Sequence, residues 1–228
     1  MIDNKILQYP QGQRTIYYPN DITNCYVINR ISKGHIWEKN ITKKIFNDCE
    51  KGSIAIDIGA NIGTHTISML DSVGDEGIVI AFEPQENLID CMKKTFEKNN
   101  NIILTSKLVS NIDGESGFMS GTGGRSRIPI DKKNYSMKTW NRELKKTITL
   151  DNYIDELKIT KNISVIKIDV EGHEFEVLEG AINTIDRYKP IIYIEVWKEC
   201  YEKLLEWNIK NPSYKIEKIG VVDYKLYI

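Results

Sequence analysis

The sequence is poor in the features that mark secreted, membrane-spanning and nucleic-acid-binding proteins. Its 228 residues include 4 cysteines without a CxxC pair, which argues against a disulfide framework or a cysteine-rich zinc site. Apolar runs stay shorter than the roughly 18 residues of a membrane span, and the first residues lack the apolar core of a signal peptide. The formal charge of -1 favours no nucleic-acid partner. We expect a soluble, cytoplasmic protein with reduced thiols and no membrane span.

Short runs of β-branched residues alternate with segments of helical length along most of the chain. The segments 87–100 and 175–185 each place their apolar residues on one helical stripe. Parallel strands joined by crossover helices have this pattern, so we predict an α/β fold with a doubly wound, mostly parallel sheet. The runs expected to form strands are SIAIDIG, GIVIAFE, NIILTSKLV, ISVIKIDV and PIIYIEVW.

Both ends of the chain depart from this pattern. At the C-terminus, SYKIEKI and YKLYI flank GVVD, which is too short for a crossover helix, so an antiparallel hairpin is expected. Residues 1–50 are expected to cap a core of residues 51–228 within a single domain, with RTIYYPN and CYVINRI as strands and IWEKNITKKIFNDC as a helix. A glycine-rich, basic stretch predicts a loop insertion at about 112–146.

The segment AIDIGANIGTHT follows a predicted strand and opens a predicted helix. Gly59 and Gly63 would let the backbone approach a ligand closely at the carboxyl end of that strand. A dinucleotide fingerprint requires glycine where Asn61 stands, and the carboxylate of Asp57 would repel a pyrophosphate. The same carboxylate suits a cationic ligand, such as the methionine part of S-adenosylmethionine.

The next strand ends in AFEP, where Glu83 offers two acceptor oxygens. An acidic residue at this place in nucleotide-binding α/β proteins accepts hydrogen bonds from the vicinal hydroxyls of a ribose. The alternative is that Glu83 and Asp57 are acidic residues of loops that point into solvent. Acids at two successive strand ends favour a nucleoside site instead.

These motifs, DIGANIGTHT and FEPQ together with IKIDVEGHEFEVLEGA and PIIYIEVW, resemble the FkbM-type methyltransferases, a branch of the class I S-adenosylmethionine-dependent enzymes. The resemblance covers about residues 34–197 and implies a seven-stranded Rossmann-like sheet with a C-terminal antiparallel hairpin. It also implies O-methyl transfer, often to sugar hydroxyls of glycans and natural products. The cofactor residues that it implies are Asp57, Gly59, Ala60, Asn61, Gly63, Thr64, Glu83 and Pro84, with Ser110 or Asn111 near the adenine and Asp169 near the methyl group.

The segment VIKIDVEGHEFEVLEG holds most of the candidate catalytic residues. A hydroxyl that accepts a methyl group must lose its proton, and a carboxylate, a histidine or a metal ion can assist that loss. Asp169 is the first candidate, since the resemblance puts it at the reaction centre. His173 is expected in the first turn of the next helix, where the dipole keeps the imidazole neutral, although a surface or capping role is the alternative. Glu171 is a further candidate.

Glu195 is the polar residue within the apolar run IIYIEVW, where a carboxylate is costly unless it has a partner. With Asp169, and with Glu171 or His173, it would suit a divalent metal ion that clamps the hydroxyl oxygens. A metal-free acid/base pair would use the same residues. Both possibilities stay open at this point.

The leading hypothesis is an S-adenosylmethionine-dependent O-methyltransferase that acts on a sugar hydroxyl of a glycan, a glycoconjugate or a smaller acceptor. Trp197 or Tyr201 would stack on the sugar, and Arg125 and Arg127 would bind a carboxylate or phosphate. One alternative is an NAD-dependent oxidoreductase, which the missing third glycine and Asp57 disfavour. The other is a non-catalytic cofactor-binding module, which would be free to lose its strand-end acids. The oligomeric state is left open.

Overall fold

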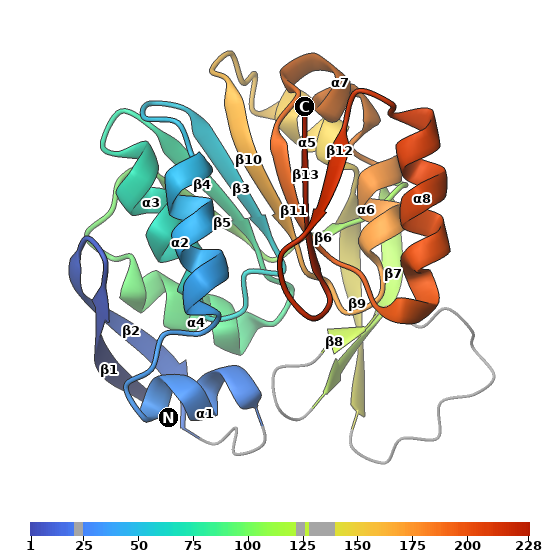
Figure 1. Ribbon diagram of the computed structural model, residues 1–228. Helices are drawn as coiled ribbons and strands as arrows, with labels where there is room; N and C mark the ends of the chain where they lie inside the picture. The colour runs from blue at the N-terminus through green and yellow to red at the C-terminus, as the bar shows by residue number, and fades with distance from the viewer. Residues whose placement is uncertain (21–24, 122–125, 128–139) are drawn as a thin grey trace.

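A seven-stranded sheet forms the centre of the computed structural model, which describes residues 1–20, 25–121, 126–127 and 140–228 (Figure 1). The strand order is β12-β13-β11-β10-β3-β4-β5. The parallel strands are β3 (Ile54–Ile58), β4 (Ile78–Phe82), β5 (Ile102–Thr105), β10 (Ile163–Ile168) and β11 (Ile191–Glu195). The C-terminal hairpin of β12 (Lys215–Lys218) and β13 (Asp223–Tyr227) joins antiparallel beside β11. The expected doubly wound sheet and its terminal hairpin are confirmed.

One predicted strand, NIILTSKLV, is divided between two sheets. Its first half is β5, whereas β6 (Leu108–Val109) leaves the main sheet and pairs with β9 (Trp140–Ile148). The polar residues Thr105 to Lys107 separate the two apolar halves and mark the break. The consequence is that Lys107 to Val109 border the carboxyl end of the main sheet rather than extending β5.

Helices cover both faces of the sheet (Figure 1). Successive residues of each strand point to opposite faces, so Ala55 and Val165 join one apolar core while Ile56 and Ile166 join the other. The first core packs against α2 (Lys39–Asp48), α3 (Thr64–Val73) and α4 (Glu86–Thr95). The second packs against α5 (Leu150–Glu156), α6 (Glu174–Glu179), α7 (Ile182–Tyr188) and α8 (Tyr201–Lys210), the last preceded by a short 3-10 turn at Lys198–Cys200. In the described residues, none of the helices is long and apolar enough to cross a membrane.

The segment 175–185 forms two helices, not the one that its apolar stripe predicted. Gly180 ends α6 and packs against the backbone of the next layer, where an added Cβ would lie 2.0 Å from the carbonyl oxygen of Ser110. The chain therefore turns at this glycine, and α7 begins at Ile182.

The N-terminal residues differ from the prediction in one element. CYVINRI, expected as a strand, forms the helix α1 (Tyr26–Ser32), whose Ile28 and Ile31 are buried on one face at a helical spacing. RTIYYPN is confirmed as part of β2 (Gly12–Pro19), which pairs with β1 (Ile2–Tyr9). The Tyr9 hydroxyl donates a hydrogen bond to the carbonyl oxygen of Thr64, 3.1 Å away. This hairpin therefore supports the start of α3.

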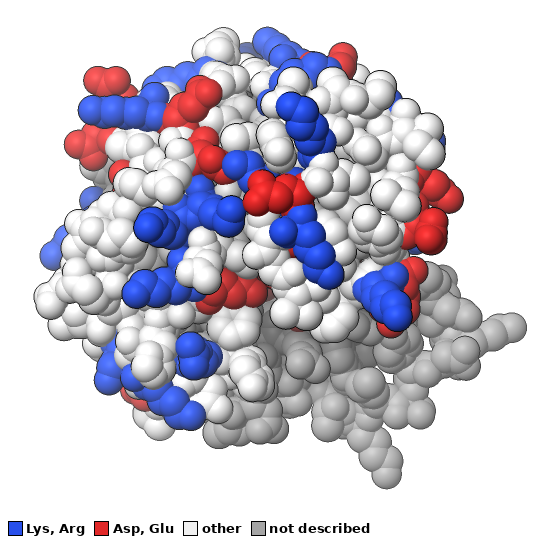
Figure 2. Space-filling model, viewed as in Figure 1, with Lys and Arg blue, Asp and Glu red and all other residues white. Residues whose placement is uncertain are grey.

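The predicted loop insertion at about 112–146 contains strands in its described part. β7 (Gly114–Gly121) pairs with β9 and with β8 (Ser126–Arg127) in a second, four-stranded sheet. The expected acceptor contact of Arg125 lies outside the described residues. On the face drawn in Figure 2, acidic and basic side chains are intermixed, as the formal charge of -1 suggested.

Candidate active site

A cavity opens where the carboxyl ends of β3, β4 and β10 meet, the usual ligand position in an open α/β sheet. Its wall contains most of the residues that the motifs singled out, which come from segments more than a hundred positions apart. These are Gly59, Ala60, Asn61, Thr64, Glu83, Pro84, Asp169, Glu171, His173 and Glu195. Four other predicted residues do not line it: Asp57, Gly63, Ser110 and Asn111.

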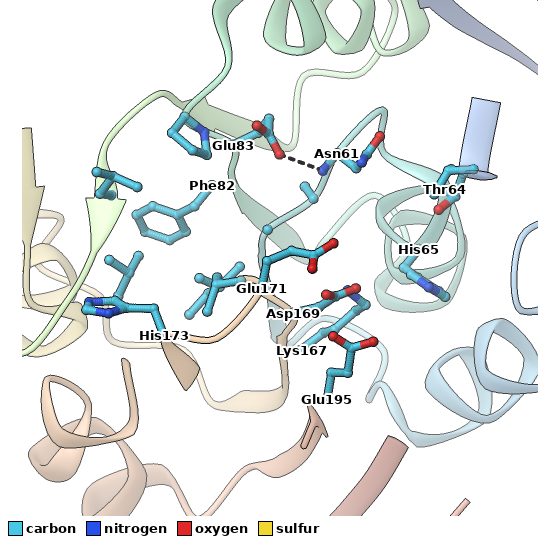
Figure 3. Close-up of a pocket in the computed structure, with 18 of the residues that line it drawn as sticks. Asn61, Thr64, His65, Phe82, Glu83, Lys167, Asp169, Glu171, His173 and Glu195 are labelled. Carbon is cyan, nitrogen blue, oxygen red and sulfur yellow. Dashed lines mark hydrogen bonds and ion pairs between the residues drawn. The ribbon is translucent and has the colours of Figure 1, made fainter. Parts of the chain in front are cut away.

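Glu83 lies at the end of β4 on one side of the cavity (Figure 3). Its two carboxylate oxygens accept hydrogen bonds from the backbone N–H groups of Asn61 and Gln85, each over 2.9 Å. Burial raises the pKa of Glu83 to about 7, although these two hydrogen bonds oppose the shift. The carboxylate thereby joins the loop after β3 to the loop after β4.

Asp57 lies beneath the cavity and does not border it. The side chain is fully buried, and its Oδ2 accepts a hydrogen bond of 2.6 Å from the Thr66 hydroxyl. Its Oδ1 lies 3.9 Å from the ammonium of Lys167. Asp57 thus contacts α3 and β10, and its expected role toward the cofactor stays a prediction.

Lys167 is the main residue that the motif analysis missed. Its side chain is 7% exposed, and its ammonium lies 3.1 Å from Asp169 Oδ2. Burial alone lowers the pKa of Lys167, but the carboxylates of Asp169 and Asp57 outweigh burial and raise it. A charged residue inside the β-branched run VIKIDV was the available signal, since a buried charge requires a partner.

Glu195 lies beside Asp169 and Lys167 at the other end of the cavity from Glu83 (Figure 3). Its Oε2 accepts a hydrogen bond of 3.1 Å from the indole N–H of Trp197. Burial, followed by the negative charges of Asp169 and Glu171, raises the pKa of Glu195 to about 8. Glu195 is therefore protonated more readily than an ordinary glutamate, next to the ion-paired Asp169.

Three non-glycine residues of the cavity wall have a left-handed backbone. Glu38 has φ 42°, Asn61 has φ 54° and Glu171 has φ 57°. Such conformations cost about 1 to 3 kcal/mol and are concentrated at functional sites. Figure 3 shows the Glu171 side chain extending between the Glu83 side and the group of Asp169 and Glu195.

His173 lies on a different side of the cavity from Asp169 and Glu195, close to Phe82 (Figure 3). Its Nε2 is 3.0 Å from the Ser110 hydroxyl, and its Nδ1 is 3.4 Å from Glu176. Burial lowers the pKa of His173, against the opposing charge of Glu176. The expected neutral imidazole thus follows chiefly from burial, while both of its ring nitrogens already have partners.

Ser110 and Asn111, which are expected near the adenine, follow the lining residues Leu108 and Val109 and do not themselves line the cavity. Ser110 contacts His173, and the Asn111 amide donates a hydrogen bond of 2.9 Å to Glu179. The turn between β5 and β6 brings Lys107 and Leu108 to the cavity wall instead. The adenine contact of Ser110 or Asn111 stays a prediction.

The candidate ion ligands are not arranged as a metal site. In the part of the chain that the structure describes, no three His, Cys, Asp or Glu side chains are placed to hold a metal ion. The ammonium of Lys167 lies 3.1 Å from Asp169 Oδ2, so this carboxylate already has a cationic partner. The geometry favours the metal-free arrangement of the same acids.

Gly59 permits the close contact between the loop after β3 and the end of β10. An added Cβ would lie 1.8 Å from the carbonyl oxygen of Asp169, and φ is +83°. Gly172 has φ +104°, but no atom lies within 4 Å of the place that an added Cβ would take. Gly59→Ala should therefore lower the free energy of unfolding by about 1 to 3 kcal/mol more than Gly172→Ala, measured by urea denaturation. Equal losses would show that the contact with Asp169 is unimportant.

A sequence model described as the Methyltransferase FkbM domain matches residues 57–207, which include every strand end that borders the cavity. The chain belongs to the FkbM methyltransferase family. This family member is 26% identical over 158 residues to the hexuronic acid methyltransferase AglP of Haloferax volcanii. The alignment covers 68% of the chain and 61% of AglP.

Solved structures show the same class I methyltransferase fold. The methyltransferase FkbM of Methylobacillus flagellatus superimposes with a TM-score of 0.54 at 20% identity, covering 79% of this chain and 43% of that one. An S-adenosylmethionine-dependent O-methyltransferase of Thermotoga maritima gives 0.51 at 12% identity, covering 97% and 76%. The chain spans less than two thirds of the length of AglP and of the Methylobacillus flagellatus protein.

Proposed function

We propose that this FkbM-family protein transfers a methyl group from S-adenosylmethionine to a hydroxyl of a sugar, in a glycan, a glycoconjugate or a smaller acceptor. The observation that carries the proposal is the cavity itself. One cavity has a buried carboxyl group, Glu83, at one end, and a carboxylate paired with an ammonium, Asp169 with Lys167, at the other. Donor and acceptor would meet between them.

The lining fits a nucleoside that carries a cationic tail. Glu83 would accept hydrogen bonds from the ribose hydroxyls, and Phe82, Leu108 and Val109 form an apolar wall for a flat base. The segment from Gly59 to Thr64 would hold the methionine part. When bound, the cofactor supplies an electrophilic methyl group on a positively charged sulfur, which suits the acidic end of the cavity.

Asp169 and Glu195 would handle the hydroxyl proton of the acceptor. Their positions at the ends of β10 and β11 place both carboxyl groups beside the same end of the cavity. Asp169 is the proton acceptor in this proposal, because its carboxylate lies at this end of the cavity beside Lys167, while Glu195, whose pKa is raised, would donate a hydrogen bond in its protonated form. Glu171 would orient the hydroxyl, since its side chain extends into the same space. Orientation of both reactants supplies most of the rate.

Calorimetry with S-adenosylhomocysteine tests the proposal. We expect saturable binding of this reaction product and no binding of NAD at the same concentration. The NAD-dependent alternative predicts the reverse, and tight NAD binding would remove our proposal. Binding of S-adenosylhomocysteine without methyl transfer to any of a panel of glycans would favour the non-catalytic module.

His173 provides a second test, because its place beside Phe82 and Ser110 suits the base of the cofactor better than the reacting hydroxyl. We expect His173→Ala to weaken S-adenosylhomocysteine binding and to change kcat by less than about tenfold. A general base would instead account for about 10² to 10⁴ in kcat. His35→Ala, at an exposed position, is the matched control. A large loss of kcat with unchanged binding would restore His173 as the base.

A sugar acceptor is supported by the relationship to AglP, which is named for hexuronic acid methylation. The family domain at residues 57–207 includes most of the cavity lining, but a relationship at 26% identity does not extend to the particular sugar. A cytoplasmic location stays a prediction from the cysteine content and composition.

A further inference from the structure

Part of the cavity wall comes from residues that precede the family domain at 57–207. Val27 lies on α1, whereas Trp37 and Glu38 lie directly before α2, and all three line the cavity. Glu38 is the charged residue of the three. The N-terminal segment, which was expected to act as a cap, therefore also brings a carboxyl group to the cavity.

Glu38 begins α2 without using its side chain to cap the helix. Its carbonyl oxygen accepts a hydrogen bond of 2.9 Å from the N–H of Thr42, but its carboxyl group makes no capping hydrogen bond. Its backbone is left-handed, with φ 42° and ψ 50°. Such a conformation is costly for a residue other than glycine and is concentrated at functional sites. The carboxyl group is thus directed to a contact outside α2.

That contact is with His65, which follows the loop after β3. His65 Nε2 lies 3.2 Å from Glu38 Oε2, and His65 Nδ1 lies 3.2 Å from the Thr42 hydroxyl oxygen. A nitrogen lone pair would repel a carboxylate oxygen, so we assign a proton between Nε2 and Oε2. The His65 side chain is 5% exposed, and both ring nitrogens contact the start of α2. The imidazole therefore fixes one oxygen of the Glu38 carboxyl group.

The other oxygen of Glu38 has no hydrogen-bond or ion-pair partner among the described residues. Three further acids of the cavity wall are engaged differently. Glu83 accepts two backbone N–H groups, and Asp169 is paired with Lys167. The raised pKa of Glu195 favours its neutral form. Glu38 thus offers a fixed carboxyl group with one oxygen left for a cationic group of a ligand.

The place of Glu38 indicates which cationic group this is. Figure 3 shows Thr64 and His65 on the opposite side of the cavity from His173. In the proposed function, the base lies near His173 and the ribose at Glu83, so the methionine part extends toward Thr64 and His65. This part of the cofactor ends in an α-ammonium group and a carboxylate. Hydrogen bonds between an ammonium and a carboxylate are among the strong ones, and Glu38 is held beside His65 by the contact described above.

We propose that Glu38 binds the α-ammonium group of S-adenosylmethionine, and that His65 is the positioning residue that fixes the Glu38 carboxyl group. The proposal rests on the proposed function, because it assigns a contact of the same donor site. It adds a cofactor-binding residue that lies outside the family domain. The N-terminal segment would then recognise the donor by charge, together with the loop from Gly59 to Thr64.

Three ligands test this proposal by calorimetry: S-adenosylhomocysteine, its deamino analogue and its decarboxylated analogue. The deamino analogue keeps the carboxylate and lacks the ammonium, and the decarboxylated analogue has the reverse composition. The unaltered protein should bind the deamino analogue about 10- to 100-fold more weakly than S-adenosylhomocysteine, as expected for losing a hydrogen bond between charged groups. Equal affinity for these two ligands would overturn the proposal without any variant.

Glu38→Gln separates the charge of Glu38 from its shape. Glutamine keeps the size of the side chain and an oxygen for His65. The variant should bind S-adenosylhomocysteine and the decarboxylated analogue about tenfold or more weakly, and the deamino analogue as tightly as the unaltered protein does. His65→Ala should give the same pattern with a smaller loss, because the Glu38 carboxyl group is then present but not fixed.

Glu97→Gln, which removes the same charge from an exposed position, is the matched control and should change none of the three affinities. Equal weakening of all three ligands by Glu38→Gln would assign Glu38 to the shape of the site and overturn the proposal. A loss confined to His65→Ala would also overturn it, since His65 would then act without Glu38.

The same ligands distinguish this proposal from the proposed function. If S-adenosylhomocysteine does not bind to the unaltered protein, the proposed function fails. If it binds and the deamino analogue binds more weakly, but Glu38→Gln keeps that difference, only the role of Glu38 fails. Another acid of the cavity would then bind the ammonium.

Discussion

Lys167→Met is expected to lower the free energy of unfolding by about 3 to 5 kcal/mol, the usual cost of removing one partner of a buried ion pair. The change leaves the fully buried Asp57 and the adjacent Asp169 without their common ammonium. Methionine retains most of the length and the apolar stem of lysine. The loss would therefore come from charge more than from a cavity. Urea denaturation at neutral pH measures it.

Lys44→Met is the control for this experiment. Lys44 pairs with Glu217 on the surface, where both side chains are 44% exposed, and its removal should cost at most about 1 kcal/mol. Adding Asp57→Asn to Lys167→Met should recover part of the lost stability, because the uncompensated charge is then removed. Similar losses for Lys167→Met and Lys44→Met would show that the buried ammonium contributes no more than a surface one.

Glu83→Ala is expected to weaken S-adenosylhomocysteine binding by about 100-fold, because hydrogen bonds to a charged group contribute about 1.5 to 3 kcal/mol. The change removes the acceptor for the ribose and leaves the N–H groups of Asn61 and Gln85 without their carboxylate. Calorimetry of both proteins gives the ratio. Glu86→Ala, at an exposed acid three positions along the chain, is the control. Unchanged affinity in Glu83→Ala would place the ribose elsewhere.

The pH dependence of binding follows from the same carboxyl group. Burial raises the pKa of Glu83 from 4.5 to about 7, so ionisation of Glu83 disfavours the folded state. Its contribution to the stability of the unliganded protein is complete below about pH 4.5 and is lost as the pH rises through 7. Ribose hydroxyls donate to the ionised form, so affinity for S-adenosylhomocysteine should weaken as the pH falls below 7. Glu83→Gln should remove this dependence, and a persistent dependence would assign it to another group.

Much of the fold was predictable because apolar patterning is a local property. The runs that became β3, β4, β10 and β11 consist of residues that favour strands and are buried on both faces. Helix α1 was mistaken for a strand because β-branched and aromatic residues suit either structure over so short a run. Ile28 and Ile31 are buried in the apolar core that also contains residues of α2, α3 and α4, and this burial favours the helix over a strand.

The sequence by itself determined which strands end in acidic residues. The carboxyl ends of parallel strands meet at one edge of the sheet, so these acids were expected to lie together. The sequence therefore brought Glu83, Asp169 and Glu195 to one cavity. Only the tertiary structure decided what each side chain contacts. The pairing of β10 with β3 sets Lys167 directly opposite Asp57, so that Asp57 supports the site from below. Register between strands more than a hundred residues apart depends on packing of the whole sheet, which no local pattern specifies.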